Sequence, residues 1–300
     1  MILVTGATGF VGPAIVRALR ERDEDVRCLV RNPTRPDAQR LRDGGCELVQ
    51  GDMTDAESLR RAAEGCAAVI HLVSIRQGSP RQFEAVMSEG TRDLVAAAQE
   101  AGVRRFVLMS ALGTNEETKD TVPYYRAKWE MEQAVQGSGL EWVIFRPSFI
   151  FGREGGILPT FARIARLAPV TPVVGSGTQR IQPIWLDDLA AIFAESVRNP
   201  DAAGRTFELG GPDALDWNEF WRRLKRAQGI RRPSLNMPMG FMKLNARVTE
   251  RLPGDIPLTP DLLRMMELGD NTADVRPSVE TFGVALTPLD EQLRLATAKR

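Results

Sequence analysis

A tyrosine and a lysine in this chain are spaced for proton transfer. Tyr124 and Lys128 lie four residues apart, and on a helix this spacing places two side chains on one face. An ammonium group beside a phenol favours the phenolate and lowers the phenol pKa, so Tyr124 would exchange a proton with a carbonyl or an alcohol near neutral pH. The chain holds only two tyrosines and five lysines, so the expected number of chance pairs at this spacing is about 0.03. We therefore interpret the pair as catalytic.

A cluster of glycines near the start of the chain is suited to binding a pyrophosphate. Gly6, Gly9 and Gly12 follow the first apolar run and precede the first helical segment. Glycines permit a tight turn and a close approach of the backbone to phosphate, and the free N–H groups of a helix N-terminus attract the anion. The spacing alone is weak evidence, since it arises by chance in about one sequence in five of this glycine content. Its position between a strand and a helix favours a dinucleotide site over a merely structural turn.

Arg31 indicates which dinucleotide binds. A site for NAD needs an Asp or Glu about 20 residues after the glycines, where the carboxylate accepts a hydrogen bond from the ribose 2′-OH. Arg31 lies at this place, 19 residues after Gly12. A guanidinium binds a 2′-phosphate through two hydrogen bonds and offers the ribose hydroxyl no acceptor. We therefore expect NADP(H) to be preferred over NAD(H); the alternative is a solvated surface arginine.

An alternation of strand and helix patterns positions these residues. Short apolar, β-branched runs recur through the first 150 residues, with helical spacing between them. The expected strands are 2–4, 26–30, 46–49, 69–73, 106–109 and 142–145, and the expected helices are 11–20, 56–63, 83–101 and 128–135. The alternation predicts an α/β fold with a doubly wound parallel sheet of the Rossmann type, buried on both faces.

The alternation ends after Gly152. Beyond it we expect helices at 155–167, 187–197, 216–227, 240–251 and 260–268 and after Pro288, and strands at 173–177, 182–185 and 206–209. The predicted domains are a nucleotide-binding domain of residues 1–152, to which about 177–212 returns, and a smaller, mostly helical lobe of 213–300 with about 153–176.

Together these motifs resemble the extended and atypical branches of the short-chain dehydrogenase/reductase superfamily. The resemblance rests on the Gly-x-x-Gly-x-x-Gly turn, on the Tyr-x-x-x-Lys pair after the fifth strand, and on the segments 146–152, 182–190 and 208–212. Over nearly its whole length the chain is most similar to the family of the nucleotide-binding accessory subunit of respiratory complex I and its free-standing bacterial relatives. That family includes members with no known turnover.

The resemblance implies roles for further residues. Lys128 would also bind the nicotinamide ribose, and Asp52 would contact the adenine, although Asp52 also reads as a helix cap before Glu57. The superfamily places a catalytic hydroxyl at the end of the fifth strand. Here Ala111 occupies the usual position and Ser110 lies one residue before it, and a slip of one residue reverses the side-chain direction on a strand. Ser110 is therefore either the catalytic hydroxyl or only a support for the turn, and in the second case Thr114 would replace it. The expected cofactor site comprises Gly6, Thr8, Gly9, Phe10, Val11, Gly12, Arg31, Asp52, Met53, Val73, Lys128, Pro147 and Phe149.

Two functions of different classes follow. The first is an NADP-dependent oxidoreductase, or an epimerase-like relative, acting on an unidentified small carbonyl or alcohol, with Tyr124, Lys128 and Ser110 as catalytic residues. The second is a non-catalytic NADP-binding scaffold or redox sensor, which Ala111 favours. Sugar-nucleotide epimerisation is less favoured, because the C-terminal half contains no clear Arg/Asn set for a diphosphate. The substrate and the oligomeric state stay open.

Composition excludes several other classes. A single histidine, His71, and three separated cysteines exclude His-rich and CxxC zinc sites, and we expect no metal. His71 is interpreted as a strand residue beside the nucleotide, with a catalytic base as the alternative. A net charge of zero gives no reason to expect nucleic acid as a partner. The chain shows no targeting segment and no apolar run of membrane-spanning length, and with its unpaired cysteines this predicts a cytoplasmic protein.

One C-terminal segment has two interpretations. Apolar residues recur there at helical spacing with basic residues around them. We interpret the segment as an amphipathic helix that packs on the small lobe or caps its pocket; the alternative is an interfacial helix that touches a membrane or an apolar, isoprenoid substrate. The apolar residues are Met237, Phe241, Leu244, Val248 and Leu252, and the basic ones are Arg231, Arg232, Lys243, Arg247 and Arg251.

Overall fold

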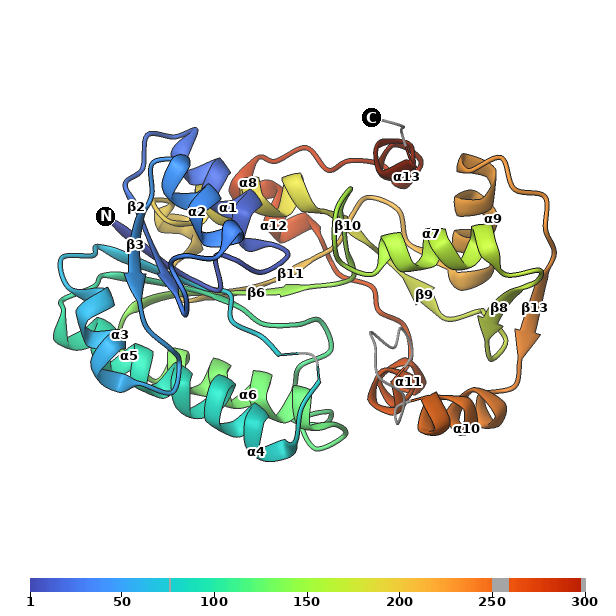
Figure 1. Ribbon diagram of the computed structural model, residues 1–300, viewed down its shortest axis with the longest axis horizontal. Helices are drawn as coiled ribbons and strands as arrows, with labels where there is room; N and C mark the ends of the chain where they lie inside the picture. The colour runs from blue at the N-terminus through green and yellow to red at the C-terminus, as the bar shows by residue number, and fades with distance from the viewer. Residues whose placement is uncertain (76, 250–258, 298–300) are drawn as a thin grey trace. The chain divides into compact units, whose positions relative to one another are not determined.

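The computed structural model describes residues 1–75, 77–249 and 259–297. The chain folds into two compact units (Figure 1). The first unit comprises Met1–Pro147, Leu186–Leu209 and Val275–Ala285, and the second comprises Ser148–Trp185, Gly210–Asp274 and Leu286–Arg300.

A seven-stranded parallel sheet forms the centre of the first unit, in the order β11-β6-β5-β4-β1-β2-β3. The side chains of β1, β4 and β5 are all buried, as a sheet covered by helices on both faces requires. The predicted doubly wound parallel sheet is therefore confirmed. Its strands are β1 Ile2–Thr5, β2 Val26–Val30, β3 Glu47–Gln50, β4 Ala68–His71, β5 Arg105–Met109, β6 Glu141–Pro147 and β11 Arg205–Leu209.

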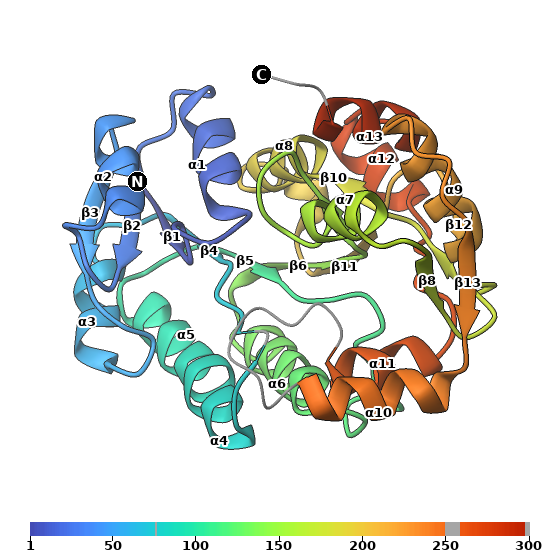
Figure 2. The ribbon, with the colours of Figure 1, turned by 45° about the vertical axis from the view of Figure 1, so that its right-hand side comes forward.

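Two layers of helices cover this sheet (Figures 1 and 2). One layer contains α1 Gly12–Arg20, α2 Pro36–Asp43, α8 Leu186–Ser196 and α12 Arg276–Phe282. The other contains α3 Ala56–Ala63, α4 Pro80–Phe83, α5 Gly90–Glu100 and α6 Pro123–Gln136. The strand order reverses between β4 and β1, where ligands bind at the carboxyl edge of open α/β sheets.

The helix expected at 83–101 is three consecutive pieces. It begins early, at α4, because Ser79 and Gln82 form a reciprocal capping box. A π-helical stretch, Glu84–Glu89, follows and leads into α5. The first residue of α5, Gly90, lies so close to the loop after β3 that a Cβ there would be 2.6 Å from the carbonyl oxygen of Met53.

The second unit is smaller and mostly helical, as expected (Figure 2). Its core is a cluster of aromatic rings from Phe161, Trp217, Phe220 and Trp221, with centroids 5.3–5.6 Å apart. Its helices are α7 Leu158–Leu167, α9 Trp217–Ala227, α10 Met239–Thr249, α11 Pro260–Glu267 and α13 Leu289–Thr297. Its strand pairs are β7 Ile150–Phe151 with β10 Ile184–Trp185, β9 Arg180–Ile181 with β12 Leu215–Asp216, and β8 Thr171–Val174 with β13 Ser234–Met237.

The units differ in detail from the domains expected from the sequence. Residues 148–152 and 177–185 belong to the second unit, because β7 pairs with β10 and β9 pairs with β12 there. Val275–Ala285 belongs to the first unit, because Phe282 of α12 packs against Phe145 and Phe207 at 5.6 and 5.0 Å between ring centroids.

The C-terminal apolar segment is only in part the expected helix. Met237 lies in β13, not in a helix, because Pro238 follows it and β13 pairs with β8. Phe241 and Leu244 lie on α10. Arg251 and Leu252 lie outside the described residues, as do the side chains of Arg247 and Val248. No helix within the described part of the chain is long and apolar enough to cross a membrane.

Candidate functional site

The glycine turn between β1 and α1 is packed so closely that it leaves no room for side chains. Gly6 has φ +75°, and a Cβ there would lie 3.0 Å from backbone atoms of Leu72 and Val73. At Gly12 a Cβ would lie 2.4 Å from the carbonyl oxygen of Ala7. The N–H of Gly9 donates to the carbonyl of Gly6 at 3.0 Å. The turn therefore depends on its glycines and presents its backbone to a ligand.

The N-terminus of α1 is available to an anion. Val11 is the N-cap, and no side chain of the described residues caps the helix there. Its first turn contains no acidic residue, so the partial positive charge of this helix end is not neutralised. Thr8 and Gly9 are exposed, Phe10 is half-buried and Val11 is buried. These features fit a pyrophosphate held by backbone N–H groups.

A polar hollow of about 450 Å³ lies at the carboxyl ends of β2 and β3. Arg31, directly after β2, lines it and is exposed. No carboxylate among the described residues forms an ion pair with Arg31, so this guanidinium is available to a phosphate. The other lining residues are Gln50, Gly51, Asp52, Asp55 and Arg61.

Asp52 in this hollow is a carboxylate anchored by its neighbours. Its Oδ1 accepts from the N–H and the hydroxyl of Thr54 at 3.0 and 2.7 Å. Burial raises the pKa of Asp52, but these hydrogen bonds and the charge of Arg31 outweigh it and hold the pKa below its usual value. The cap of α3 is Asp55, which accepts from Glu57 and Ser58. Asp52 is therefore not the N-cap of α3, which was the alternative to its role as an adenine contact.

Lys128 lies on α6 and is fully buried. Its Nζ donates to the carbonyl oxygen of Met109 at 2.7 Å and lies 5.8 Å from the ring centroid of Tyr124. Burial lowers the pKa of Lys128 to about 7, although the charge of Glu132 opposes this. Burial thus favours the neutral amine, which lies on the same helix face as Tyr124.

Glu132 extends this face of α6 by one further turn. It is fully buried, and both its oxygens accept from Arg146, at 2.9 and 2.6 Å. The hydrogen bonds to Glu132 raise the pKa of Arg146, against the effect of burial. The result is a row of Tyr124, Lys128 and Glu132, the last of which the sequence analysis missed. Two features of the sequence could have indicated Glu132: it continues the four-residue spacing of Tyr124 and Lys128, and the segment 146–152 begins with an arginine, Arg146, that can pair with it.

Tyr125, the other tyrosine, is unsuited to proton exchange. Its hydroxyl donates to the carbonyl oxygen of Leu112 at 3.2 Å, and its side chain is buried. Burial, with the neighbouring Tyr124, raises the pKa of Tyr125 to about 12. Tyr124 is only half-buried. The two adjacent phenols therefore have different environments, and the accessible one is spaced four residues from Lys128.

Two buried hydroxyls follow β5. The side-chain oxygens of Ser110 and Thr114 have no hydrogen-bond partner among the described residues. The backbone N–H of Ser110 donates to the carbonyl of Phe145 at 2.7 Å, which anchors the strand end. Ala111, between the two hydroxyls, is half-buried. An unpaired buried hydroxyl is destabilising by about 1–3 kcal/mol, so these groups are open to a partner that a ligand would supply.

His71 at the end of β4 has a defined tautomer. The hydroxyl of Thr91 donates to the carbonyl of Met87 and therefore accepts from Nε2–H of His71 at 2.9 Å. Nδ1 then accepts from the hydroxyl of Thr5 at 2.6 Å. Burial, followed by the charge of Lys128, lowers the pKa of His71 to about 3. The ring stays neutral at physiological pH, which favours a structural role over that of a catalytic base.

The remaining expected cofactor residues fall into both units. Met53 and Pro147 are buried and Val73 is half-buried in the first unit. Phe149 belongs to the second unit, where its ring lies 5.6 Å from that of Trp217.

A narrow apolar pocket of about 40 Å³ lies within the second unit. Its walls are almost entirely apolar and contain no charged side chain, so it suits a small hydrocarbon group. It is lined by Phe149, Ile157, Phe161, Ile164, Pro172, Val174, Trp217, Trp221, Leu262 and Met266.

A family model described as NAD(P)H-binding matches residues 6–160, which include the glycine turn, Arg31 and the Tyr124–Lys128 pair. The chain belongs to this NAD(P)H-binding family. Within it, the predicted similarity to the complex I accessory subunit is confirmed. The mitochondrial NADH dehydrogenase (ubiquinone) 1 alpha subcomplex subunit 9 of Rattus norvegicus is 30% identical over 302 residues, which cover 96% of this chain and 77% of the relative.

Two of the proteins that this chain resembles are reductases by name. Ceramide reductase of Caulobacter vibrioides is 31% identical over 240 residues, covering 79% of this chain and 74% of the relative. Among solved structures, the NADPH-dependent quinone oxidoreductase of Escherichia coli complexed with NADPH superimposes with a TM-score of 0.80 over 98% of each chain. At 22% identity this last likeness shows the fold alone.

Proposed function

We propose that the protein is an NADPH-dependent oxidoreductase of the short-chain dehydrogenase/reductase type, acting on a small carbonyl or alcohol. The observation that carries the proposal is the pair on α6, with accessible Tyr124 one turn from a lysine fixed by the carbonyl of Met109. NADP(H), when bound, supplies or accepts a hydride. The chain then has to provide a binding site, a proton and a place for the substrate.

Binding is assigned to the glycine turn and the hollow beside β2. Backbone N–H groups at the turn of Gly6, Gly9 and Gly12 hold the pyrophosphate, and Arg31 holds the 2′-phosphate. The closed turn, the uncapped α1 and the unpaired Arg31 support this assignment. The further cofactor residues are Thr8, Phe10, Val11, Asp52, Met53, Val73, Lys128, Pro147 and Phe149.

Proton exchange is assigned to Tyr124. Its hydroxyl exchanges a proton with the substrate oxygen, and Lys128 binds the nicotinamide ribose and stabilises the phenolate when protonated. Ser110 is the proposed hydrogen-bond donor to the substrate oxygen, supported by its unpaired hydroxyl. Ser110→Ala should then lower kcat by about tenfold or more without destabilising the fold, since an unpaired buried hydroxyl is removed. An unchanged kcat would remove Ser110 from the site.

The substrate is proposed to be a small molecule with an apolar part. The apolar pocket of the second unit supports this, as does the printed name of the Caulobacter relative, a reductase of a lipid. A cytoplasmic location belongs to the same proposal, and three buried free cysteines support a reducing compartment.

The second candidate function is a non-catalytic NADPH-binding scaffold or redox sensor. Ala111 at the usual hydroxyl position favours it, as does the rat relative, which is named as a subunit of a larger enzyme. Steady-state oxidation of NADPH with a panel of quinones, aldehydes and ketones separates the two. Multiple turnovers on any member support the enzyme, whereas tight NADPH binding without turnover on the whole panel supports the scaffold.

Arg31→Ala tests the cofactor preference. Loss of a charge-assisted contact to the 2′-phosphate should weaken NADPH binding by about 10- to 100-fold and leave NADH binding nearly unchanged. NADPH and NADH fluorescence titrations measure both affinities. Arg42→Ala on the exposed surface of α2 is a matched control. An equal change for both cofactors would contradict the assignment.

A further inference from the structure

Large exposed apolar side chains of the second unit lie on three of its segments: the end of α7 with the loop before β8, strand β13, and helix α10, which directly follows β13. Five large apolar residues there have exposed fractions between 37% and 62%: Leu167, Val170, Leu235, Phe241 and Leu244. Single exposed apolar residues are common on protein surfaces, whereas a contiguous exposed apolar surface marks an interaction site.

Backbone contacts bring the segments of this face together. β8 and β13 pair in parallel with Leu235 opposite Pro172, and the N–H of Thr171 donates to the carbonyl of Pro233 at 3.0 Å. The guanidinium of Arg232 donates to the carbonyl of Ala168 at 2.9 Å, next to Leu167. The exposed residues at the end of α7 and in the loop after it, Leu167 and Val170, therefore lie near the segment that precedes and forms β13.

The helix α10 adds a second apolar surface to this face. Met242 and Ala246, four residues apart, are buried against the unit. Phe241 and Leu244, three residues apart, are exposed. A helix that is apolar on two sides is normally covered on both. Among the described residues, the unit covers the side of Met242 and Ala246 and leaves the side of Phe241 and Leu244 exposed.

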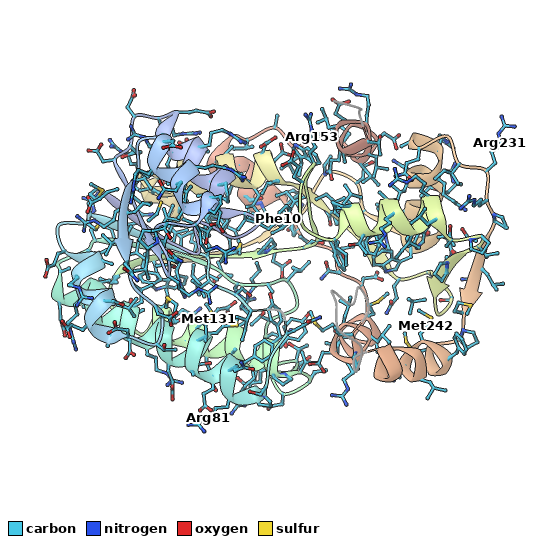
Figure 3. The ribbon with its side chains drawn as sticks, viewed as in Figure 1. Phe10, Arg81, Met131, Arg153, Arg231 and Met242 are labelled. Atoms are coloured by element: carbon cyan, nitrogen blue, oxygen red, sulfur yellow. The ribbon has the colours of Figure 1, made fainter. Side chains whose placement is uncertain are left out.

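The charge of the same segments is one-sided. Residues 155–186 contain three basic residues and 220–249 contain eight, and neither segment contains an acidic residue. Three of these eight pair with carboxylates outside the segment: Arg222 and Arg223 with Glu219, and Lys243 with Glu267. Within the described residues no carboxylate forms an ion pair with Arg163, Arg166, Arg226, Arg231 or Arg232. Arg231 extends away from the ribbon (Figure 3). The face therefore combines exposed apolar side chains with unneutralised guanidinium groups.

We propose that this face docks the protein on an anionic lipid bilayer. Aliphatic and aromatic side chains enter the boundary between headgroups and acyl chains, while arginines bind lipid phosphates and the negative surface potential attracts them. Guanidinium groups suit phosphate because they bind it with two hydrogen bonds. A nucleic-acid duplex would use the arginines but presents phosphates and sugars, not hydrocarbon, to the side chains of Leu235, Phe241 and Leu244.

The apolar pocket adjoins the docking face and supports a lipid occupant. In a parallel pair, residues opposite one another project from the same side of the sheet. Leu235 is therefore on the side of Pro172, which lines the pocket. The apolar wall thus continues from the pocket to the exposed surface, as expected for a face that meets hydrocarbon.

Vesicle flotation of the full chain tests the proposal. We expect binding to vesicles of phosphatidylcholine with added phosphatidylglycerol, weaker binding to phosphatidylcholine alone, and loss of binding as salt is raised. The double variant Arg231→Glu/Arg232→Glu should weaken binding by about 25-fold or more, since each lost basic residue is worth about fivefold. Phe241→Ser/Leu244→Ser should weaken it on both kinds of vesicle.

Two control variants test whether a change in net charge, or the loss of an exposed apolar side chain outside the docking face, is enough to reduce binding. Arg40→Glu/Arg42→Glu makes the same charge change on α2 of the first unit, and Leu268→Ser removes another exposed apolar side chain. Both should bind vesicles like the wild type, and all variants should keep NADPH binding, which shows that they fold. Three results would overturn the proposal. The first is binding that does not depend on phosphatidylglycerol, and the second is an equally large loss of binding in Arg40→Glu/Arg42→Glu. The third is self-association through Phe241 and Leu244 without any binding to vesicles.

Discussion

Lys128 is fully buried although lysine is normally charged and exposed, and its surroundings determine its protonation. Its Nζ bonds to the carbonyl of Met109, and Glu132 four residues on is itself paired with Arg146. Burial favours the neutral amine, whereas the negative charge of Glu132 favours the ammonium, and burial has the larger effect on the pKa of Lys128. Burial therefore dominates and brings the pKa of Lys128 to about 7. A bound ribose that accepts from Nζ would favour the charged form.

The depressed pKa of Lys128 predicts a pH dependence of stability. Between about pH 7 and 10.5 the unfolded chain holds this proton and the folded chain does not. The free energy of unfolding therefore rises with pH in this window, by up to about 1.4 kcal/mol per pH unit from this group. Urea unfolding of the wild type and Lys128→Met, from pH 6 to 10, should show this rise as a difference between the two curves. Parallel curves would contradict the buried amine.

At the scale of elements, β1, the glycine turn and α1 act together, and Gly12 permits the close contact between the start of α1 and the turn. A methyl group there would lie 2.4 Å from the carbonyl oxygen of Ala7, and neither atom can rotate away because both are bonded directly to the backbone. The turn, and with it the N-terminus of α1, has to move to admit a side chain. The same contact therefore serves packing and ligand binding.

Gly12→Ala should lower both stability and cofactor affinity. We expect a loss of about 1–3 kcal/mol in unfolding free energy from the overpacked turn and at least a tenfold weaker NADPH affinity. Gly44→Ala is the control: it ends α2 with φ −76°, and its Cβ would meet nothing closer than 3.4 Å. Thermal unfolding with fluorescence titration measures the two effects. A Gly12→Ala protein that binds like the Gly44→Ala protein would show that the turn does not hold the ligand.

The sequence predicts well those elements that are determined by the local spacing of apolar residues and glycines. The strands β1 to β6 and helix α6 follow from apolar runs and from spacing, so the glycine turn and the Tyr124–Lys128 pair were found before the fold. The π-helical stretch before Gly90 was not, because apolar spacing does not distinguish a short π-helical stretch from the α-helices on either side of it. Likewise Arg61 and Gln50 reach the hollow of Arg31 only through the pairing of β2 with β3 and the packing of α3.

For the whole molecule, the chain crosses between the two units several times. The last return, Val275–Ala285, brings Phe282 against Phe145 of β6 and Phe207 of β11. Periodicity does not predict this return, because the segment is short and its single anchoring ring meets partners far earlier in the sequence. The domain expectation assigned it to the small lobe for that reason.

Phe282→Ala should destabilise the first unit from a position near the C-terminus. Removing a buried phenylalanine from the cluster leaves a cavity and is expected to lower the unfolding free energy by about 3–5 kcal/mol. Val279→Ala on the same helix, at a 37% exposed side chain, should change it by less than about 1 kcal/mol. Urea unfolding compares the two. Equal, small effects would mean that α12 is not part of the folded core.

Turnover by the two tyrosine variants tests the central proposal most directly. Tyr124→Phe removes the hydroxyl assigned to proton exchange, and Tyr125→Phe removes the buried neighbour that bonds to Leu112. With a substrate found in the carbonyl panel, we predict that Tyr124→Phe lowers kcat by about 10²- to 10⁴-fold at unchanged NADPH affinity. Tyr125→Phe should keep kcat within about threefold and lose only about 1 kcal/mol of stability. A Tyr124→Phe protein that turns over as fast as the wild type would contradict the proposed catalytic role of the pair.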